Sequence, residues 1–375
     1  MRADLPTRDN IRGGAVLYFD HASGALPDAE TLDTIKECIA RYPANQEAVH
    51  PLAYEARKAF EDARVKLARI LTGTSDFRAV AFSGGTAAIA ALSHWQRLRN
   101  KKVFTTRMEH PAVSACLRQA QAECRCFELD KNGVIKALSI PEGGCKAVFI
   151  THVHSETGTI QPVDEVFAKN SAGSVIKICD TIQSAAKIPL PRSADVMTVS
   201  GAKFGVPGAA ALLVRKEFAK EIEDIALDLR RNYQVCRINI PMFAAMTEVI
   251  QKRMERQASD FAYAEAIREL CCELAAERKI NCTIAPEHSS PYICHLNFPQ
   301  AEGAVIVRLL GAEGICVGSG TACSAETPEP SSAMLALGFS KKAAFGGVRI
   351  SFNASTTACD IKKLFDVLEK VLKNY

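Results

Sequence analysis

Lys203 is the residue whose setting in this sequence points most directly to chemistry. It follows a β-branched run, Val196–Val199, and then three small residues. Charged side chains are seldom buried without a use, so a lysine at the end of an apolar strand is unusual. In an apolar pocket a lysine loses its proton more readily and can attack a carbonyl carbon to form a Schiff base. A solvent-facing lysine at a strand end is the alternative that these residues leave open.

Three further groups follow other strand-like runs. Asp180 comes after residues 175–179, His110 after residues 103–106, and a glycine turn after residues 80–82. Such a turn at a helix start directs backbone N–H groups at an anion, commonly a phosphate. Taken singly, each group is more often structural. Together they match a pyridoxal phosphate site, which needs a lysine, a carboxylate for the pyridine nitrogen, a flat group over the ring and phosphate donors. The chain supplies these as Lys203, Asp180, His110, and Gly85-Thr86 with Ser200.

The elements that must position these residues are strands alternating with helices. This order predicts an α/β fold with a mostly parallel sheet covered by helices on both faces. In such a sheet, ligands bind beyond the carboxyl ends of the strands, where His110, Asp180 and Lys203 all fall. Residues 241–279 are predicted to form one long helix, a bridge to a second part of the chain.

Length predicts two domains, because 375 residues exceed the size at which a single core stops growing. We expect a large cofactor-binding domain at residues 16–245. Residues 1–15 and 246–375 are expected to form a smaller α+β domain.

Composition excludes several classes of protein. A net charge of +4 without a basic block argues against nucleic acid as a partner. No apolar run reaches transmembrane length, and the N-terminus lacks the apolar core of a secretion signal, so we expect a cytoplasmic protein away from membranes. The 14 cysteines include no Cys-x-x-Cys pair, so neither a metal site nor a disulfide framework is expected.

In their order and wording, these motifs resemble the pyridoxal-phosphate-dependent cysteine desulfurases of the class V aminotransferase family. The most specific segment is Gly318-Ser319-Gly320-Thr321-Ala322-Cys323. The other matching segments are Tyr18-Phe19-Asp20, His50 with Glu55-Ala56-Arg57, Ser83-Gly84-Gly85-Thr86, Glu109-His110-Pro111, Glu156–Pro162, Asp180 with Gln183-Ser184, Ser200–Lys203, Glu329-Pro330-Ser331, Ala336-Leu337-Gly338 and Val348–Ser351. The resemblance covers nearly the whole chain and implies a divergent member with fold type I, whose large domain holds a seven-stranded sheet.

The resemblance also implies a role for each candidate residue. Lys203 would form the Schiff base and move protons, and His110 would stack on the ring and assist acid–base steps. Asp180 would pair with the pyridine nitrogen and Gln183 with the phenolic oxygen of the ring. Arg349 would hold the substrate carboxylate in a bidentate fork. The remaining cofactor contacts would come from Gly85, Thr86 and Ser200 at the phosphate, and from Ser155 and Asn239.

Cys323 would be the nucleophile that takes the sulfur atom. Its surroundings, residues 318–325, have little bulk and much backbone freedom, which suits a mobile loop. The implied reaction removes sulfur from L-cysteine, leaving L-alanine and a persulfide on Cys323 for a sulfur acceptor protein. Family members are homodimers, so a homodimer is expected.

The chain departs from the family pattern at several cofactor contacts. Ala87 and Ala202 replace a glutamate and a histidine, and Ser155 replaces an asparagine within His154-Ser155-Glu156. The Arg-Ser-Gly-Thr element has its nearest match at residues 236–239, where Arg237 or Asn239 would substitute. Residues 20–24, Asp-His-Ala-Ser-Gly, replace an Asn-Ala-Ala-Thr-Thr element.

Two alternatives stay open. A selenocysteine lyase, or another class V aminotransferase or lyase, would share the fold and the cofactor site, and only Cys323 and its loop favour desulfuration. A non-catalytic regulatory protein on the same scaffold is favoured by the altered phosphate contacts and disfavoured by Lys203 and Cys323.

Overall fold

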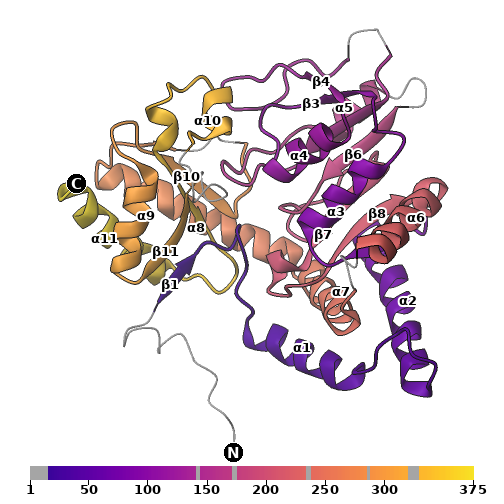
Figure 1. Ribbon diagram of the computed structural model, residues 1–375. Helices are drawn as coiled ribbons and strands as arrows, with labels where there is room; N and C mark the ends of the chain where they lie inside the picture. The colour runs from indigo at the N-terminus through magenta and orange to yellow at the C-terminus, as the bar shows by residue number, and fades with distance from the viewer. Residues whose placement is uncertain (1–15, 141–143, 171–174, 234–237, 285–287, 320–328) are drawn as a thin grey trace, which may run out of the picture.

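Two β-sheets with their own helices make up the protein in the computed structural model (Figure 1). The structure describes residues 16–140, 144–170, 175–233, 238–284, 288–319 and 329–375.

The larger sheet has seven strands in the order β2-β8-β7-β6-β5-β3-β4. Every neighbouring pair is parallel except the two pairs that β8 makes with β2 and β7. All residues of β5 and β7 are buried, as is typical of strands covered on both faces. The strands are β2 (Phe77–Phe82), β3 (Lys102–Thr105), β4 (Glu123–Cys126), β5 (Ala147–Thr151), β6 (Ile176–Asp180), β7 (Val196–Ser200) and β8 (Ala210–Arg215). The predicted α/β fold and seven-stranded, mostly parallel sheet are confirmed.

Helices cover both faces of this sheet because alternate strand residues point to opposite sides. On β5, Val148 and Ile150 join the core beneath one set of helices, whereas Ala147 and Phe149 join the core beneath the other. The first set is α2 (Pro51–Thr72), α5 (Val163–Lys169) and α7 (Ile240–Glu255), and the second is α3 (Gly85–Ala91), α4 (Pro111–Gln119) and α6 (Lys216–Tyr233).

The smaller sheet has five strands in the order β1-β11-β12-β10-β9. They are β1 (Leu17–Phe19), β9 (Thr283–Ile284), β10 (Ile293–Asn297), β11 (Ile315–Ser319) and β12 (Gly347–Ser351). A separate core joins this sheet to α8 (Gln257–Glu277), α9 (Gly303–Ala312) and α11 (Ala358–Lys373). Two further helices are α1 (Ala29–Arg41), which packs on α7, and the short α10 (Ser332–Ala336).

The expected domain limits stay a prediction. The strand pairing of β1 differs from them. β1 falls inside the expected large domain, yet it pairs in parallel with β11 of the smaller sheet. Phe19 explains this position, because it is buried in the core of the smaller sheet.

The prediction of one long helix over residues 241–279 is wrong. α7 and α8 are separate helices that meet at Arg256, whose φ of −107° and ψ of 6° lie outside the helical range. α7 packs against the larger sheet and α8 against the smaller one, so the break lets the chain pass between two cores. Among the described helices, none combines the length and the apolar character needed to cross a membrane.

Candidate active site

Asp180 is the last residue of β6, and its carboxylate is held from the neighbouring strand. Oδ1 accepts hydrogen bonds from the Thr198 hydroxyl at 2.5 Å and from the Ile182 backbone N–H at 3.0 Å. Thr198 lies on β7 and also accepts from the Thr181 N–H at 3.0 Å. Both bonds to Asp180 use Oδ1, so Oδ2 is the oxygen that can meet an N–H group of a ligand.

His110 is the N-cap of α4, and its ring faces the same edge of the sheet. Its Nδ1 accepts from the Ala112 backbone N–H at 3.1 Å, so the proton of the neutral ring lies on Nε2. Burial lowers the pKa of His110; Asp180 opposes this shift, whereas the cations Lys203 and Arg349 add to it. His110 therefore presents a neutral ring with a donor at Nε2. In its predicted acid–base role the neutral ring would take up a proton at Nδ1, which would break the capping hydrogen bond from the Ala112 N–H.

Lys203 lies in a short 3-10 turn, Gly201–Phe204, directly after β7. Its ammonium donates to the backbone carbonyls of Ala22 and Ser23, both at 2.7 Å. The Gln183 amide donates to the same Ala22 carbonyl at 2.8 Å. Gln183 Oε1 is buried without a hydrogen-bond partner among the described residues. The turn at residues 20–24 thus gathers two predicted site residues, although the sequence marked it only as a departure from the family.

Gly85 and Ser200 meet at the start of α3. A Cβ at Gly85 would lie 3.2 Å from Ser200 Cβ and 2.7 Å from Ile182 Cδ1, so a side chain there would enter the space between them. Ser200 is buried, and Thr86 is exposed in the first turn of α3. The predicted phosphate donors therefore lie together at a helix start that directs backbone N–H groups outward.

Arg349 reaches the site from β12 of the smaller sheet. One terminal nitrogen, Nη2, donates to Asp20 Oδ1 at 2.6 Å and to Ser23 Oγ at 2.5 Å. The other, Nη1, donates to the Ser155 carbonyl at 2.8 Å. Arg349 is buried, so the ion pair with Asp20 has little contact with solvent.

Two predicted cofactor contacts, Ser155 and Asn239, form other hydrogen bonds in the described structure, and two further predicted residues lie outside it. Ser155 uses its carbonyl on Arg349, and the role of its side chain at the cofactor stays a prediction. Asn239 is exposed and caps α7, with its side chain accepting from the Met242 N–H at 3.2 Å. Cys323 and Arg237 lie outside the described residues.

Two buried histidines, His154 and His295, lie near Arg349. His295 lies opposite Arg349 in the β10–β12 ladder, and burial followed by the Arg349 charge lowers its pKa to about 4. The pKa of His154 is lowered to about 3, mainly by burial and to a smaller extent by the positive charges of His295, His110 and Arg349. His154 Nδ1 accepts from the Thr157 N–H at 3.2 Å. The replacement of asparagine by His154 was the sequence signal; His295 had none.

Lys187 is a second lysine beside Lys203. Both line a small cavity together with His21 and Tyr292, and the Lys187 ammonium stands 5.6 Å from the centre of the Tyr292 ring. Burial, followed by the charges of Lys203 and Arg349, lowers the pKa of Lys187 to about 7. Lys187 follows Gln183 by four residues, but a single lysine in a helical turn carries no signal of its own.

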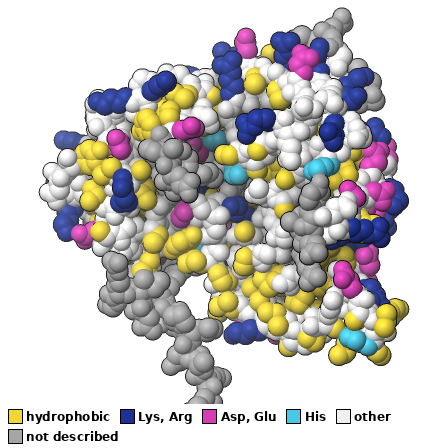
Figure 2. All heavy atoms as spheres, viewed as in Figure 1, with side chains coloured by type: hydrophobic (Ala, Val, Ile, Leu, Met, Phe, Trp, Pro, Cys, Tyr) yellow, Lys and Arg dark blue, Asp and Glu magenta, His cyan; other side chains and the backbone are white. Residues whose placement is uncertain are grey.

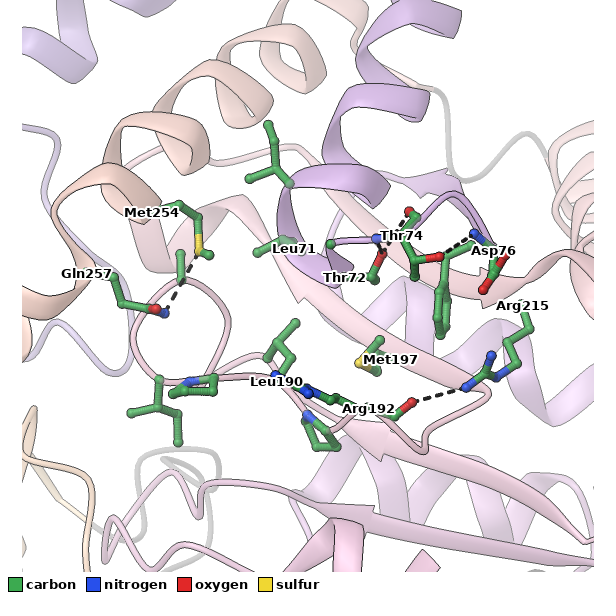
Figure 3. A pocket seen from close by; sticks show the side chains of 17 residues that line it. Leu71, Thr72, Thr74, Asp76, Leu190, Arg192, Met197, Arg215, Met254 and Gln257 are labelled. Carbon is green, nitrogen blue, oxygen red and sulfur yellow. Dashed lines mark hydrogen bonds between the residues drawn. The ribbon is translucent and has the colours of Figure 1, made fainter.

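A cavity of about 460 Å³ is lined by residues other than the predicted site residues (Figure 3). Its walls are mainly apolar side chains, including Leu71, Leu190 and Met197. The charged side chain of Arg215 is held by the carbonyls of Arg192 and Ala194. The described residues that line it include Asp76 and Arg192 but no lysine, so this cavity does not offer the amine that Lys203 supplies.

The comparisons with known proteins agree with this fold. A family model described as aminotransferase class-V matches residues 17–364, so the chain belongs to that family. The relatives that the chain resembles carry a narrower name than the family, cysteine desulfurase.

The chain is 27% identical over 373 residues to the putative cysteine desulfurase NifS of Bacillus subtilis (strain 168), covering 93% of each chain. It is 24% identical over 377 residues to the cysteine desulfurase of Trichormus azollae, covering 96% of this chain and 93% of that one. The X-ray structure of a NifS-like protein from Rickettsia africae ESF-5 matches with a TM-score of 0.81 at 18% identity, covering 96% of this chain and 99% of that chain. The resemblance found in the sequence is confirmed at the level of family and fold.

Proposed function

We propose that this protein is a cysteine desulfurase, which removes sulfur from L-cysteine and leaves L-alanine. The observation that carries the proposal is the convergence of Lys203, Asp180, His110 and Arg349 on one edge of the larger sheet, in a chain similar to cysteine desulfurases throughout its length.

The residues present fit pyridoxal phosphate, on which class-V aminotransferases in general depend. The space in front of Gly85 and Ser200 would take the phosphate, and Asp180 Oδ2 would take the pyridine N–H. The partnerless Gln183 Oε1 lies at the same edge, and its amide group would meet the phenolic oxygen. Bound there through Lys203, the cofactor would withdraw electrons from the amino-acid substrate.

The four site residues then have separate roles. Asp180, fixed by Thr198, keeps a negative charge beside the pyridine nitrogen. His110 covers the ring and holds a proton at Nε2. Lys203 Nζ accepts a proton from the substrate carbon and returns it. Arg349 binds the substrate carboxylate.

Cys323 would receive the sulfur atom. Its thiolate attacks the substrate sulfur, a sulfur–sulfur bond forms, and the carbon–sulfur bond breaks with its electron pair left on carbon. The carbon then takes a proton and L-alanine leaves, while the persulfide stays on Cys323. Cys323 belongs to residues 320–328, and described residues lie close to both ends of this range. Gly318 lies beside Arg349, and Ser331 donates a hydrogen bond to Glu156.

Absorbance and product assays test the function together. Purified protein mixed with pyridoxal phosphate should turn yellow. With a dithiol present to reduce the persulfide, L-cysteine should give equal amounts of alanine and sulfide. Cys323→Ser should keep the colour and lose sulfide formation. A selenocysteine lyase that needs no thiol would keep its activity in this variant. Colourless protein that releases no alanine would favour the regulatory alternative.

A second copy of the chain is the proposed partner, with a sulfur acceptor protein following from the function by analogy. Apolar side chains gather on the lower part of the molecule in Figure 2, over α1 and α2. Among the described residues, the exposed large apolar side chains of this region are Leu26, Ile39, Val49, Leu52, Tyr54 and Val65. Contiguous exposed apolar surface of this kind marks a protein interface. Sedimentation of the purified protein checks whether it is a dimer.

A further inference from the structure

Asp20 lies where Arg349 would meet the substrate carboxylate. Its Oδ1 is 2.6 Å from Arg349 Nη2, and Ser23 Oγ accepts from the same nitrogen. A carboxylate of the chain therefore already shares the guanidinium that the proposed function assigns to the substrate.

The edge of the guanidinium that Asp20 adjoins can be identified from Gly318. A Cβ at Gly318 would lie 2.6 Å from Asp20 Oδ1, 2.7 Å from Arg349 Nη2 and 3.1 Å from Arg349 Nε. Asp20 Oδ1 is thus beside the edge formed by Nε and Nη2, and arginine binds carboxylates in a fork through such paired N–H groups. Arg349 Nε is buried with no hydrogen-bond partner among the described residues, so Asp20 satisfies one N–H group of this edge and the other stays unsatisfied.

The charges of Arg349 and Asp20 decide how strongly a substrate carboxylate can bind. The Arg349 side chain is 7% exposed and that of Asp20 is 22% exposed, so solvent screens their interaction weakly. The pair is neutral, and a substrate carboxylate bound to Arg349 would place two negative charges beside one guanidinium. His154 and His295 cannot offset it, because their lowered pKa values keep both rings neutral near pH 7.

We propose that Asp20 is a specificity-determining residue, a built-in carboxylate that competes with the substrate for Arg349 and so weakens the binding of carboxylate-bearing ligands. This inference rests on the proposed function in one respect, the assignment of Arg349 to the substrate carboxylate. It predicts a linkage: removing the charge of Asp20 leaves a buried, unpaired guanidinium, and a bound carboxylate then restores the lost counter-charge.

The first test uses the enzyme with pyridoxal phosphate and two amines that differ by a carboxylate, L-alanine and ethylamine. Binding is read from the change in cofactor absorbance, without turnover. Asp20→Asn should lower the Kd of L-alanine about tenfold and leave that of ethylamine within about twofold. Ser23→Ala is the matched control. It removes a hydroxyl that accepts from Arg349 Nη2 and donates to Asp20 Oδ1, and it keeps the charge of Asp20, so neither Kd should change by more than about threefold.

The second test needs no cofactor. Propionate should raise the Tm of Asp20→Asn by several degrees more than that of the parent, because only the variant has an unpaired guanidinium. The double variant Asp20→Asn/Arg349→Gln should lose this response. Asp20→Ser serves as the second variant if Asp20→Asn does not fold.

The outcomes separate the inference from the proposed function. Weaker L-alanine binding in Asp20→Asn, or equal changes for L-alanine and ethylamine, would overturn the inference. A parent protein that never binds pyridoxal phosphate would overturn the proposed function alone. The propionate response would still decide the role of Asp20.

Discussion

The two sheets contribute to the candidate site by different routes. On the larger sheet, Asp180 and its partner Thr198 are 18 positions apart and lie on adjacent parallel strands. On the smaller sheet, Arg349 and its partner Asp20 are 329 positions apart, and the turn that holds Asp20 follows β1. The proposed cofactor side (Asp180, His110 and Lys203) is thus built from neighbours in one sheet, and the proposed substrate side (Arg349 and Asp20) from the two ends of the chain.

This difference has a physical consequence. The pairing of β6 with β7 positions Asp180 and does not depend on the smaller sheet. Arg349 depends on the pairing of β1 with β11 and of β11 with β12, as well as on its own side-chain bonds. We therefore expect changes on the cofactor side to affect chemistry, and changes on the substrate side to affect binding.

Lys203→Ala should give the largest effect. It removes the amine that attaches the cofactor and moves the proton, so kcat should fall at least about a thousandfold. Lys187→Ala is the matched control, since it removes the second amine of the same cavity, and its kcat should stay within about tenfold of the parent. Alanine formation from L-cysteine measures both. Comparable losses in the two variants would mean that the two lysines share the task.

Arg349→Lys should separate binding from chemistry. A lysine keeps the charge but cannot bind the Ser155 carbonyl, Asp20 and Ser23 in the same plane. The KM for L-cysteine should rise about 10- to 100-fold, with a smaller change in kcat. Arg278→Lys, which changes an arginine paired with Asp366 on the smaller domain, is the control for loss of a guanidinium elsewhere. A fall in kcat without a rise in KM would contradict the division between the two sides.

The sequence predicted the positions of Asp180, His110 and Lys203 because local patterns specify strand ends. A short apolar run followed by a polar residue marks a strand end, and parallel strands bring such ends to one edge, so Asp180, His110 and Lys203 could be placed together. His110 caps α4 and is also within reach of the charges of Asp180, Lys203 and Arg349, so its structural role does not exclude the proposed one.

The substrate side could not be read in the same way. Nothing local to Asp20 indicates that it pairs with Arg349, because strand pairing in the smaller sheet brings the two residues together. Lys187 and His295 acquire lowered pKa values from burial, which no spacing in the sequence reports. The break at Arg256 was missed because α7 and α8 both have helical patterns and differ only in the core they face.

Gly85→Ala tests how closely the cofactor side is packed. The new Cβ would lie 2.7 Å from Ile182 Cδ1 and 3.2 Å from Ser200 Cβ. The isoleucine end can turn away, but Ser200 is fixed in β7, so affinity for pyridoxal phosphate should fall about tenfold while the fold is kept. Gly84→Ala is the matched control, because a Cβ there meets nothing within 4 Å. Titration of the cofactor by absorbance measures both. Equal affinities in the two variants would show that the phosphate does not bind at Gly85.

Lys187→Met should produce the smallest effect, a change in stability that depends on pH. The pKa of Lys187 is about 7 in the folded protein against 10.5 for an ordinary lysine, so the unfolded chain binds more protons between these pH values. The stability of the parent therefore rises with pH across this window, whereas the variant lacks this contribution. The variant should be more stable than the parent by about 1–2 kcal/mol at pH 7, and the difference should shrink toward pH 10. Urea unfolding at several pH values measures it, with Lys58→Met on the exposed side of α2 as the control for losing a lysine. A difference that grows with pH would mean that Lys187 is charged in the folded protein.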